Sequence, residues 1–282
     1  RGRRRLDPGG MSGALISARG LTLSLPDLGA KRLFGPKPLV EILKGLDFDL
    51  PRGAVTGIVG ESGSGKSTLG RCLIRLHAPT DGRIYFDGAD ITRLSGVQLA
   101  PYRRDLQMIF QDPMSSLNPR HTIRRIVEGP LRVNGFEDVR ARADEAMHRA
   151  RLPQGAADRY PHQLSGGQRQ RVGIARAIAL RPKFILADEI VSGLDVSTQA
   201  EILRLLEELV ADLGLTMAFV SHDLSVVRRL CSKVIVMRAG KIVEQGPVAQ
   251  IFDAPLDRYT AALKEAIPLP EIDRGWLRAA AE

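Results

Sequence analysis

A glycine-rich segment followed by lysine and serine is the strongest chemical signal in this 282-residue chain. It lies between a short apolar run and an amphipathic stretch, and it matches the spacing G-x-x-x-x-G-K-[ST] with Gly60, Glu61, Ser62, Gly63, Ser64, Gly65, Lys66 and Ser67. Glycines let successive backbone N–H groups turn toward phosphate oxygens, and the helix that follows adds its partial positive charge. We expect Lys66 to bridge the β- and γ-phosphates of a nucleotide, Ser67 to bind Mg²⁺ and Thr68 to touch the α-phosphate. An ordinary glycine-rich turn is the alternative, and the Lys-Ser pair argues against it.

Two adjacent carboxylates follow a second apolar run. Residues 184–187 predict a buried strand, and Asp188 and Glu189 come directly after it. A buried strand that ends in acidic residues delivers them to the edge of a sheet where ligands bind. Asp188 is suited to the Mg²⁺ shell through water, and Glu189 is placed to polarise an attacking water molecule. A surface Asp-Glu pair that opens a loop is the alternative, and the phosphate-binding motif makes it the weaker one.

A third signal lies between these two, at the start of a predicted helix. Leu164 is followed by Ser165, Gly166, Gly167 and Gln168. A helix N-terminus with serine and glycine can hold an anion, although such a triplet is more often a linker or a helix cap. The sequence carries further motifs in the same order as a known family, namely Gln111 in Gln111-Asp112-Pro113, Ser192-Gly193-Leu194-Asp195, and His222 in Ser221-His222-Asp223.

With these motifs the chain resembles the nucleotide-binding subunits of ABC transporters, from about Leu15 to Ala262. The resemblance implies an α/β fold of the P-loop NTPase class: a RecA-like core, an antiparallel β subdomain and an inserted α-helical subdomain. It implies ATP and Mg²⁺ as cofactors and an ATPase activity. Two such subunits would pair head to tail, with each ATP between the phosphate loop of one chain and the Ser165–Gln168 segment of the other.

The resemblance also assigns roles to single residues. Gln111 would coordinate Mg²⁺ and the attacking water, and would report the nucleotide state to a membrane partner. His222 would hold the γ-phosphate and keep Glu189 oriented, so that Gln111, Glu189 and His222 are the expected catalytic residues. Asp195 would communicate across the dimer.

Within the family the chain is most similar to importers of the dipeptide, oligopeptide and nickel group, through residues 110–120, 165–171, 195–200, 221–227 and 259–263. That likeness implies two transmembrane permease subunits, a second ATPase subunit and an exported solute-binding protein as partners. The solute would be a peptide or nickel, and the chain would sit peripherally on the cytoplasmic face of the cell membrane. Some members of the group carry an iron–sulfur cluster on C-terminal cysteines. No cysteine follows Cys231, so we expect no cluster here.

Composition excludes several other classes of protein. Lys and Arg number 41 against 32 Asp and Glu, a net charge of +9, and aromatic residues make up 5% of the chain. No basic cluster inside the chain is interleaved with aromatic residues, so we expect no nucleic-acid partner. Two cysteines are too few for a disulfide framework or a cysteine-rich metal site. No run approaches the ~18 apolar residues of a membrane span.

The pattern of apolar residues and breakers predicts the domain organisation. Residues 1–11 are expected to be a disordered tail or a leftover before Met11, residues 12–247 the ATPase domain, and residues 248–282 a C-terminal helical tail. The helical subdomain is expected at about residues 113–180, where β signals vanish. Strands are predicted over residues 15–25, 42–50, 54–59, 83–86, 106–110, 184–187, 217–220 and 234–237. Helices are predicted over residues 67–75, 123–131, 139–151, 166–180 and 196–213.

Two positions depart from the family pattern. Leu25 stands where relatives usually place an aromatic residue that stacks on adenine, and Phe34 is the one candidate substitute. We therefore expect weak discrimination between ATP and GTP. After Glu189 the chain reads Ile190-Val191 where Pro-Thr is common, so the turn that carries Glu189 is expected to be looser, or the pair is ordinary drift.

Two other functions remain as alternatives. One is a soluble ABC ATPase that acts on RNA, ribosomes or DNA, although such proteins usually join two cassettes or carry a long coiled-coil insertion. The other is a regulatory subunit that binds ATP without hydrolysing it, which the presence of Lys66, Gln111 and Glu189 argues against. The sequence distinguishes neither the solute nor a homodimer from a pair with a paralogue.

Overall fold

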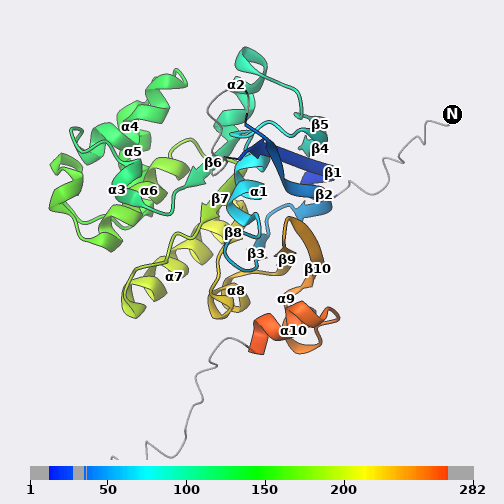
Figure 1. Cartoon of the computed structure of the whole chain (residues 1–282). Helices are drawn as coiled ribbons and strands as arrows, with labels where there is room; N and C mark the ends of the chain where they lie inside the picture. Colours follow the sequence, from blue (N-terminus) through cyan, green and yellow to red (C-terminus); the bar gives the residue numbers. More distant parts are fainter. Residues whose placement is uncertain (1–12, 28–34, 36, 266–282) are drawn as a thin grey trace, which may run out of the picture.

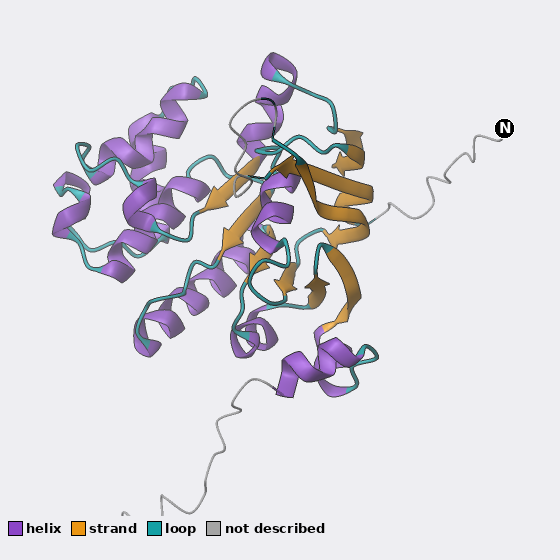
Figure 2. Ribbon diagram, in the orientation of Figure 1, coloured by secondary structure: helices purple, strands orange, loops and turns teal. Residues whose placement is uncertain are grey.

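The computed structural model describes residues 13–27, 35 and 37–265. Its strands form two sheets that lie against each other, and a group of helices extends from one side of the larger sheet (Figure 1). Figure 2 shows the same arrangement by secondary structure, with the antiparallel strands on the right and the helices above, to the left and below.

The smaller sheet is antiparallel and comes from the first part of the chain. Within the described residues it has the order β2-β1-β4-β5, with β1 at Ala14–Pro26, β2 at Leu39–Pro51, β4 at Asp81–Phe86 and β5 at Ala89–Asp90. The strands predicted over residues 15–25, 42–50 and 83–86 are confirmed. Buried and more exposed residues alternate along the second half of β1 and along β4, because one face of this sheet packs on the core and the other meets solvent.

The larger sheet is mostly parallel. Its order over the described residues is β10-β9-β3-β8-β7-β6, and only β10 runs antiparallel to its neighbour. The bounds are β3 Val55–Val59, β6 Leu106–Ile109, β7 Phe184–Asp188, β8 Thr216–Val220, β9 Lys233–Arg238 and β10 Lys241–Pro247. The strand β10 is not predicted from the sequence, because Glu244, Gln245 and Gly246 interrupt its apolar pattern. The parallel register brings the carboxyl ends of β3, β7 and β8 to the same edge.

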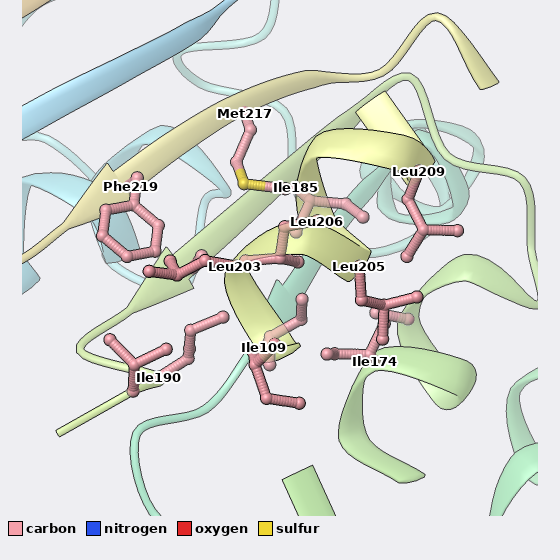
Figure 3. Packing of buried hydrophobic residues seen from close by; sticks show 14 of the residues in the cluster. Ile109, Ile174, Ile185, Ile190, Leu203, Leu205, Leu206, Leu209, Met217 and Phe219 are labelled. Carbon is pink, nitrogen blue, oxygen red and sulfur yellow. The ribbon is translucent and has the colours of Figure 1, made fainter. Parts of the chain in front are cut away.

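Both faces of the parallel sheet are buried, which explains its nearly continuous apolar strands. Along β7, Phe184 and Leu186 face the cluster between the two sheets, whereas Ile185 and Ala187 face the cluster under the helices. Figure 3 shows the helix side, where Ile185, Met217 and Phe219 pack against leucines of α7 (Val196–Leu213). This alternation follows from the two-residue period of a strand.

The helix that follows the phosphate-binding motif lies between the sheets. This helix, α1 (Lys66–Leu73), buries Leu69, Cys72 and Leu73 in the cluster shared by both sheets. On the opposite face of the parallel sheet lie α6 (Gly166–Ile178), α7 and α8 (Leu224–Leu230). The start of α1 is therefore held rigidly from two sides.

The helical part begins after β6. It contains α3 (Pro113–Ser116), α4 (Ile123–Val133), α5 (Val139–Arg149), the short 3₁₀ turns Ala156–Asp158 and Pro161–Gln163, and then α6. No strand occurs among the described residues from Pro113 to Ile178, as predicted. The helix α2 (Gly96–Asp105) is not predicted from the sequence, since it contains Pro101 and has weak apolar periodicity.

The described chain ends in two short helices, α9 (Val248–Asp253) and α10 (Arg258–Glu265), which lie beside β10 (Figure 1). The predicted tail at residues 1–11, Phe34 and residues 266–282 lie outside the described residues. Across the described part of the chain, every helix is too short or too polar to cross a bilayer.

Candidate functional site

The glycine-rich loop connects the end of β3 to the start of α1, at the carboxyl edge of the parallel sheet. Gly60 has a φ of 145°, and a Cβ there would lie 2.1 Å from the Met237 carbonyl oxygen, so no other residue fits. Gly63 and Gly65 also adopt positive φ angles, of 78° and 101°. These conformations turn the loop around a space in front of the N-terminus of α1, which is the arrangement that binds phosphate.

Lys66 lies inside this loop. Its side chain is buried at 6% exposure, and its Nζ donates hydrogen bonds of 2.8 Å to the carbonyl oxygens of Gly60 and Glu61. Burial lowers the pKa of Lys66, against the opposing effect of the nearby negative charges. Within the described residues no carboxylate lies at ion-pair distance from it. A buried ammonium with backbone partners alone is suited to an incoming anion that supplies the missing counter-charge.

Ser67 and Asp188 meet directly. The Ser67 hydroxyl donates to Asp188 Oδ1 at 2.7 Å, while Asp188 Oδ2 is buried without a hydrogen bond, 3.7 Å from an Arg71 nitrogen. Burial is the main cause that raises the pKa of Asp188. A hydroxyl and a buried, incompletely satisfied carboxylate beside a phosphate-binding loop fit Mg²⁺, which takes few protein ligands and completes its shell with phosphate oxygens and water.

Glu189 follows in a strained backbone conformation. Its φ is 49°, in the left-handed region that costs a non-glycine residue about 1 kcal/mol or more. Its carboxylate accepts a 2.9 Å hydrogen bond from Gln111 Nε2 and lies 3.5 Å from His222 Nδ1. Glu189 keeps 21% side-chain exposure, and His222 keeps 63%. The structure therefore brings together all three residues that the sequence analysis expected to be catalytic, at a point open to water.

The turn after Glu189 is anchored, contrary to the looser turn expected from the loss of Pro-Thr. Ile190 and Val191 are 1% and 5% exposed, and Ile190 packs into the cluster seen in Figure 3. The Ser192 hydroxyl donates to the Glu189 carbonyl at 2.7 Å, and the Glu189 amide donates to the Val220 carbonyl at 3.0 Å. Apolar burial replaces the stiffness that proline would supply.

The Ser165–Gln168 segment lies apart from this cluster. Ser165 caps α6: its hydroxyl accepts from the Gln168 amide, and the Gln168 side chain accepts from the Ser165 amide. Gly166 starts the helix, and Gly167 faces Thr198 of α7 at a distance that leaves no room for a side chain. Within the described residues, no hydrogen bond joins this segment to the loop at residues 60–68.

Asp195 has a local structural task. Its carboxylate caps α7 by accepting from the Thr198 amide at 2.9 Å and from the Ser197 hydroxyl at 2.6 Å. These hydrogen bonds, with Ser197 first, hold the pKa of Asp195 well below its usual range. A role across a dimer interface remains a prediction from the resemblance.

The position expected to stack on adenine is aliphatic. Leu25 is half-buried near the end of β1 and packs against the cluster between the sheets, so it offers no aromatic face. Weak discrimination between ATP and GTP stays a prediction.

One contact at the site was not predicted from the sequence: Arg71 lies one helical turn after Ser67, and its guanidinium lies near the Asp188 carboxylate. Ser67 and Arg71 are four residues apart on the same face of α1, and this spacing is the sequence signal for the contact.

Comparison with known proteins places the chain in one family. The protein-family model described as ABC transporter matches residues 43–192. A putative peptide import ATP-binding protein of Brucella ovis is 47% identical over 262 residues, which cover 92% of this chain and 80% of that protein. The oligopeptide transport ATP-binding protein AppF of Bacillus subtilis is 48% identical over 234 residues, which cover 82% and 71% of the two chains.

Solved structures agree in fold. The dimeric, post-hydrolysis structure of the ATP-binding cassette MJ0796 with ADP and Pi matches with a TM-score of 0.72 and 33% identity, over 83% of this chain and 98% of that one. The cbiO1 subunit of Clostridium perfringens, part of an ABC transporter complex, matches with a TM-score of 0.74 and 30% identity, over 95% and 99%. The expected P-loop NTPase fold with its two added subdomains is confirmed. The chain belongs to the ABC transporter family, as an ATP-binding cassette of that family.

Proposed function

We propose that this chain is the ATP-hydrolysing subunit of an importer that takes up peptides. One observation carries the hydrolytic part: the Glu189 carboxylate accepts a hydrogen bond from Gln111 and lies 3.5 Å from His222, immediately beside the Ser67–Asp188 pair and the phosphate loop. The relatives named as peptide or oligopeptide import proteins support the choice of peptides over nickel as the solute.

The residues divide the chemistry between them. The amides of the loop at residues 60–68 and the Lys66 ammonium hold the phosphates of ATP, and Ser67 and Asp188 provide the protein side of the Mg²⁺ shell. When bound, Mg²⁺ neutralises phosphate charge beside the bond that breaks. Glu189 orients and polarises water, because its carboxylate accepts a hydrogen bond from Gln111 and lies 3.5 Å from His222 at a point open to solvent.

A second ATPase subunit completes the site in this proposal. The Ser165–Gln168 segment caps its own helix and stays apart from the phosphate loop of the same chain, so it is available to the nucleotide of a partner. The dimeric MJ0796 cassette supports a paired arrangement. The partner is a second copy or a paralogue. Opening and closing of that interface is what converts ATP hydrolysis into motion.

The permeases would dock on the helical part. A groove of about 760 Å³ there is lined by four arginines, Arg124, Arg125, Arg132 and Arg176, with the buried Glu128 among them. Nη2 of Arg176 is buried without a hydrogen-bond partner. Arg132 is paired with Glu128 and Arg124 with Asp144, whereas Arg125 and Arg176 form no ion pair among the described residues. The remaining positive charge favours an acidic segment of a permease, with Pro113–Leu117 at the rim. Docking there would hold the chain on the cytoplasmic face of the membrane, and an exported binding protein would bring the peptide.

The division of the chain is part of the proposal. We assign residues 12–247 to the ATPase domain, about 113–180 to its helical subdomain and 248–282 to a C-terminal tail. The helices from α3 to α6 and their shared cluster support the middle assignment.

The decisive experiment is Glu189→Gln. The amide keeps the shape and the contact with Gln111 but no longer attracts a proton from water, so ATP affinity should change by less than about threefold while turnover falls by about 10²–10⁴. Steady-state phosphate release with the cognate permeases and ATP titration measure the two effects. Lys66→Ala is the matched control, in which ATP binding itself is lost. Wild-type turnover in E189Q would remove Glu189 from its proposed role.

A further inference from the structure

A hydroxyl from the C-terminal helix touches the backbone of the phosphate loop. Tyr259 lies on α10, far outside the matched residues 43–192, and its phenol oxygen accepts a 3.0 Å hydrogen bond from the Glu61 amide. The side chain is buried at 8% exposure, and the guanidinium of Arg238 lies 4.9 Å from the ring centroid. The contact joins residues 198 positions apart in the sequence.

The same face of the loop is held by the hairpin between β9 and β10. The Gly240 amide donates to the Ser64 carbonyl at 3.1 Å, and the Met237 carbonyl lies against Gly60. One backbone donor and one backbone acceptor of the loop are therefore occupied by the part of the chain after residue 236. Both hydrogen bonds fix backbone groups of the loop from outside it, and so they constrain how its remaining amides are arranged.

The helix that carries Tyr259 is itself fixed in place. Glu244, on β10, is buried and its two carboxylate oxygens accept from the amides of Leu256 and Asp257, just before α10 begins. The Tyr259 amide donates to the Asp257 side chain at 2.7 Å. Figure 1 shows α9 and α10 beside β10, at the end of the molecule where the described chain stops. Tyr259 thus approaches the loop from a supported position.

We propose that Tyr259 is a positioning residue for the phosphate loop, and that through it the segment after β10 sets the affinity for nucleotide phosphates. The inference rests on the proposed function, in which this loop binds ATP. With the hydroxyl present, the Glu61 amide is paired before any nucleotide arrives, and the loop already has its binding shape. Without it, binding must first order the loop, which reduces affinity.

The proposal separates binding from hydrolysis. The Glu61 amide belongs to the loop that surrounds the phosphates, whereas Glu189, Gln111 and His222 make no contact with Tyr259. Loss of the hydroxyl should therefore weaken ATP and ADP by the same factor, raise KM and leave kcat unchanged. A purely structural tyrosine would change thermal stability without this split.

The test is Tyr259→Phe in the full chain, which keeps the ring and its contact with Arg238. We expect Kd for ATP and for ADP to rise about two- to tenfold, the range of one hydrogen bond, with kcat at saturating ATP within about twofold of wild type. Hydrogen exchange at the Glu61 amide should accelerate in the nucleotide-free protein. Tyr102→Phe is the control, since that ring packs edge-on against Phe86 in the antiparallel sheet.

Unchanged Kd and unchanged exchange at Glu61 would overturn the proposal, and so would a lower kcat with an unchanged KM. Leu263→Ala is the second variant. It removes apolar contacts between α10 and the core but keeps the Tyr259 hydroxyl, and it should also raise Kd for ATP and ADP. A wild-type protein that does not bind ATP would instead overturn the proposed function, so the two failures are distinguishable.

Discussion

At the scale of single residues, the site is built from groups that folding alone disfavours. Lys66 is a buried ammonium, Asp188 a buried carboxylate with one oxygen that accepts no hydrogen bond, and Glu189 a non-glycine residue with positive φ. Each costs folding free energy in the nucleotide-free protein. Such costs concentrate where a ligand or a reaction offsets them, which is the physical argument for a functional site here.

Asp188 provides a test of that cost through pH. Because burial raises the pKa of Asp188, the folded state binds its proton more tightly than the unfolded state does, so stability falls as pH rises above the usual carboxyl range. Asp188→Asn removes the ionisable group and with it this loss of folding stability at higher pH. The nucleotide-free variant should melt above wild type at pH 7, by about 2–4 °C for each kcal/mol gained, and the difference should shrink toward pH 4. Its ATPase activity should fall about 10- to 100-fold.

Thermal melts across pH measure the effect. Asp87→Asn is the control of opposite sign, because Lys183 and Arg52 hold the pKa of Asp87 below its usual value, so that carboxylate stabilises the fold at neutral pH. Parallel curves for wild type and D188N at every pH would contradict the argument.

At the scale of elements, the Ser165–Gln168 segment is placed by the contact between α6 and α7. Gly167, at the start of α6, faces Thr198 near the start of α7, and a Cβ there would lie 2.4 Å from the Thr198 methyl carbon. Asp195, which caps α7, fixes Thr198 in turn. The glycine is thus required by helix packing within one chain, as well as by any anion that approaches from outside.

Gly167→Ala should therefore destabilise the protein by about 1–3 kcal/mol, the usual cost of overpacking. Gly129→Ala, where a Cβ has free space on α4, should instead stabilise it by about 0.5–1 kcal/mol. Adding Thr198→Ser, which deletes the methyl group, should recover most of the loss. Urea unfolding of G167A, G129A and the double variant G167A/T198S measures the three changes in stability. A G167A protein as stable as wild type would show that α6 and α7 tolerate the extra carbon.

At the scale of the whole molecule, the proposed function divides the nucleotide site between two surfaces that one chain does not bring together. The phosphate loop, Asp188 and Glu189 lie at the edge of the parallel sheet, and the Ser165–Gln168 segment lies with the helices. A nucleotide with a highly charged triphosphate needs donors on all sides, so a second subunit is expected to supply the missing ones. The similar structures of the MJ0796 cassette are dimeric.

A nucleotide site shared by two subunits predicts that the chains pair when ATP is bound. In the E189Q variant ATP is bound and not consumed, so light scattering should give twice the 30.8 kDa mass of the chain, or the mass of a pair with a co-expressed paralogue. Removal of ATP should return the monomer. Monomers alone in the presence of trapped ATP, even with the cognate permeases supplied, would contradict the shared site.

Local patterns determined the α/β class, the phosphate loop and the position of Asp188 and Glu189, because a strand's two-residue period and a loop's glycines act over a few neighbours. Gln111 and His222 came from the resemblance to the family. The helix α2 and the strand β10 could not be predicted, since Pro101 and Glu244 break their local patterns and packing against other elements stabilises them. Only the tertiary structure decided that Ile190 and Val191 stiffen the turn at Glu189, and that Tyr259 reaches Glu61. Contacts between residues so far apart in the sequence depend on how the sheets and helices pack together, which cannot be predicted from a short stretch of sequence.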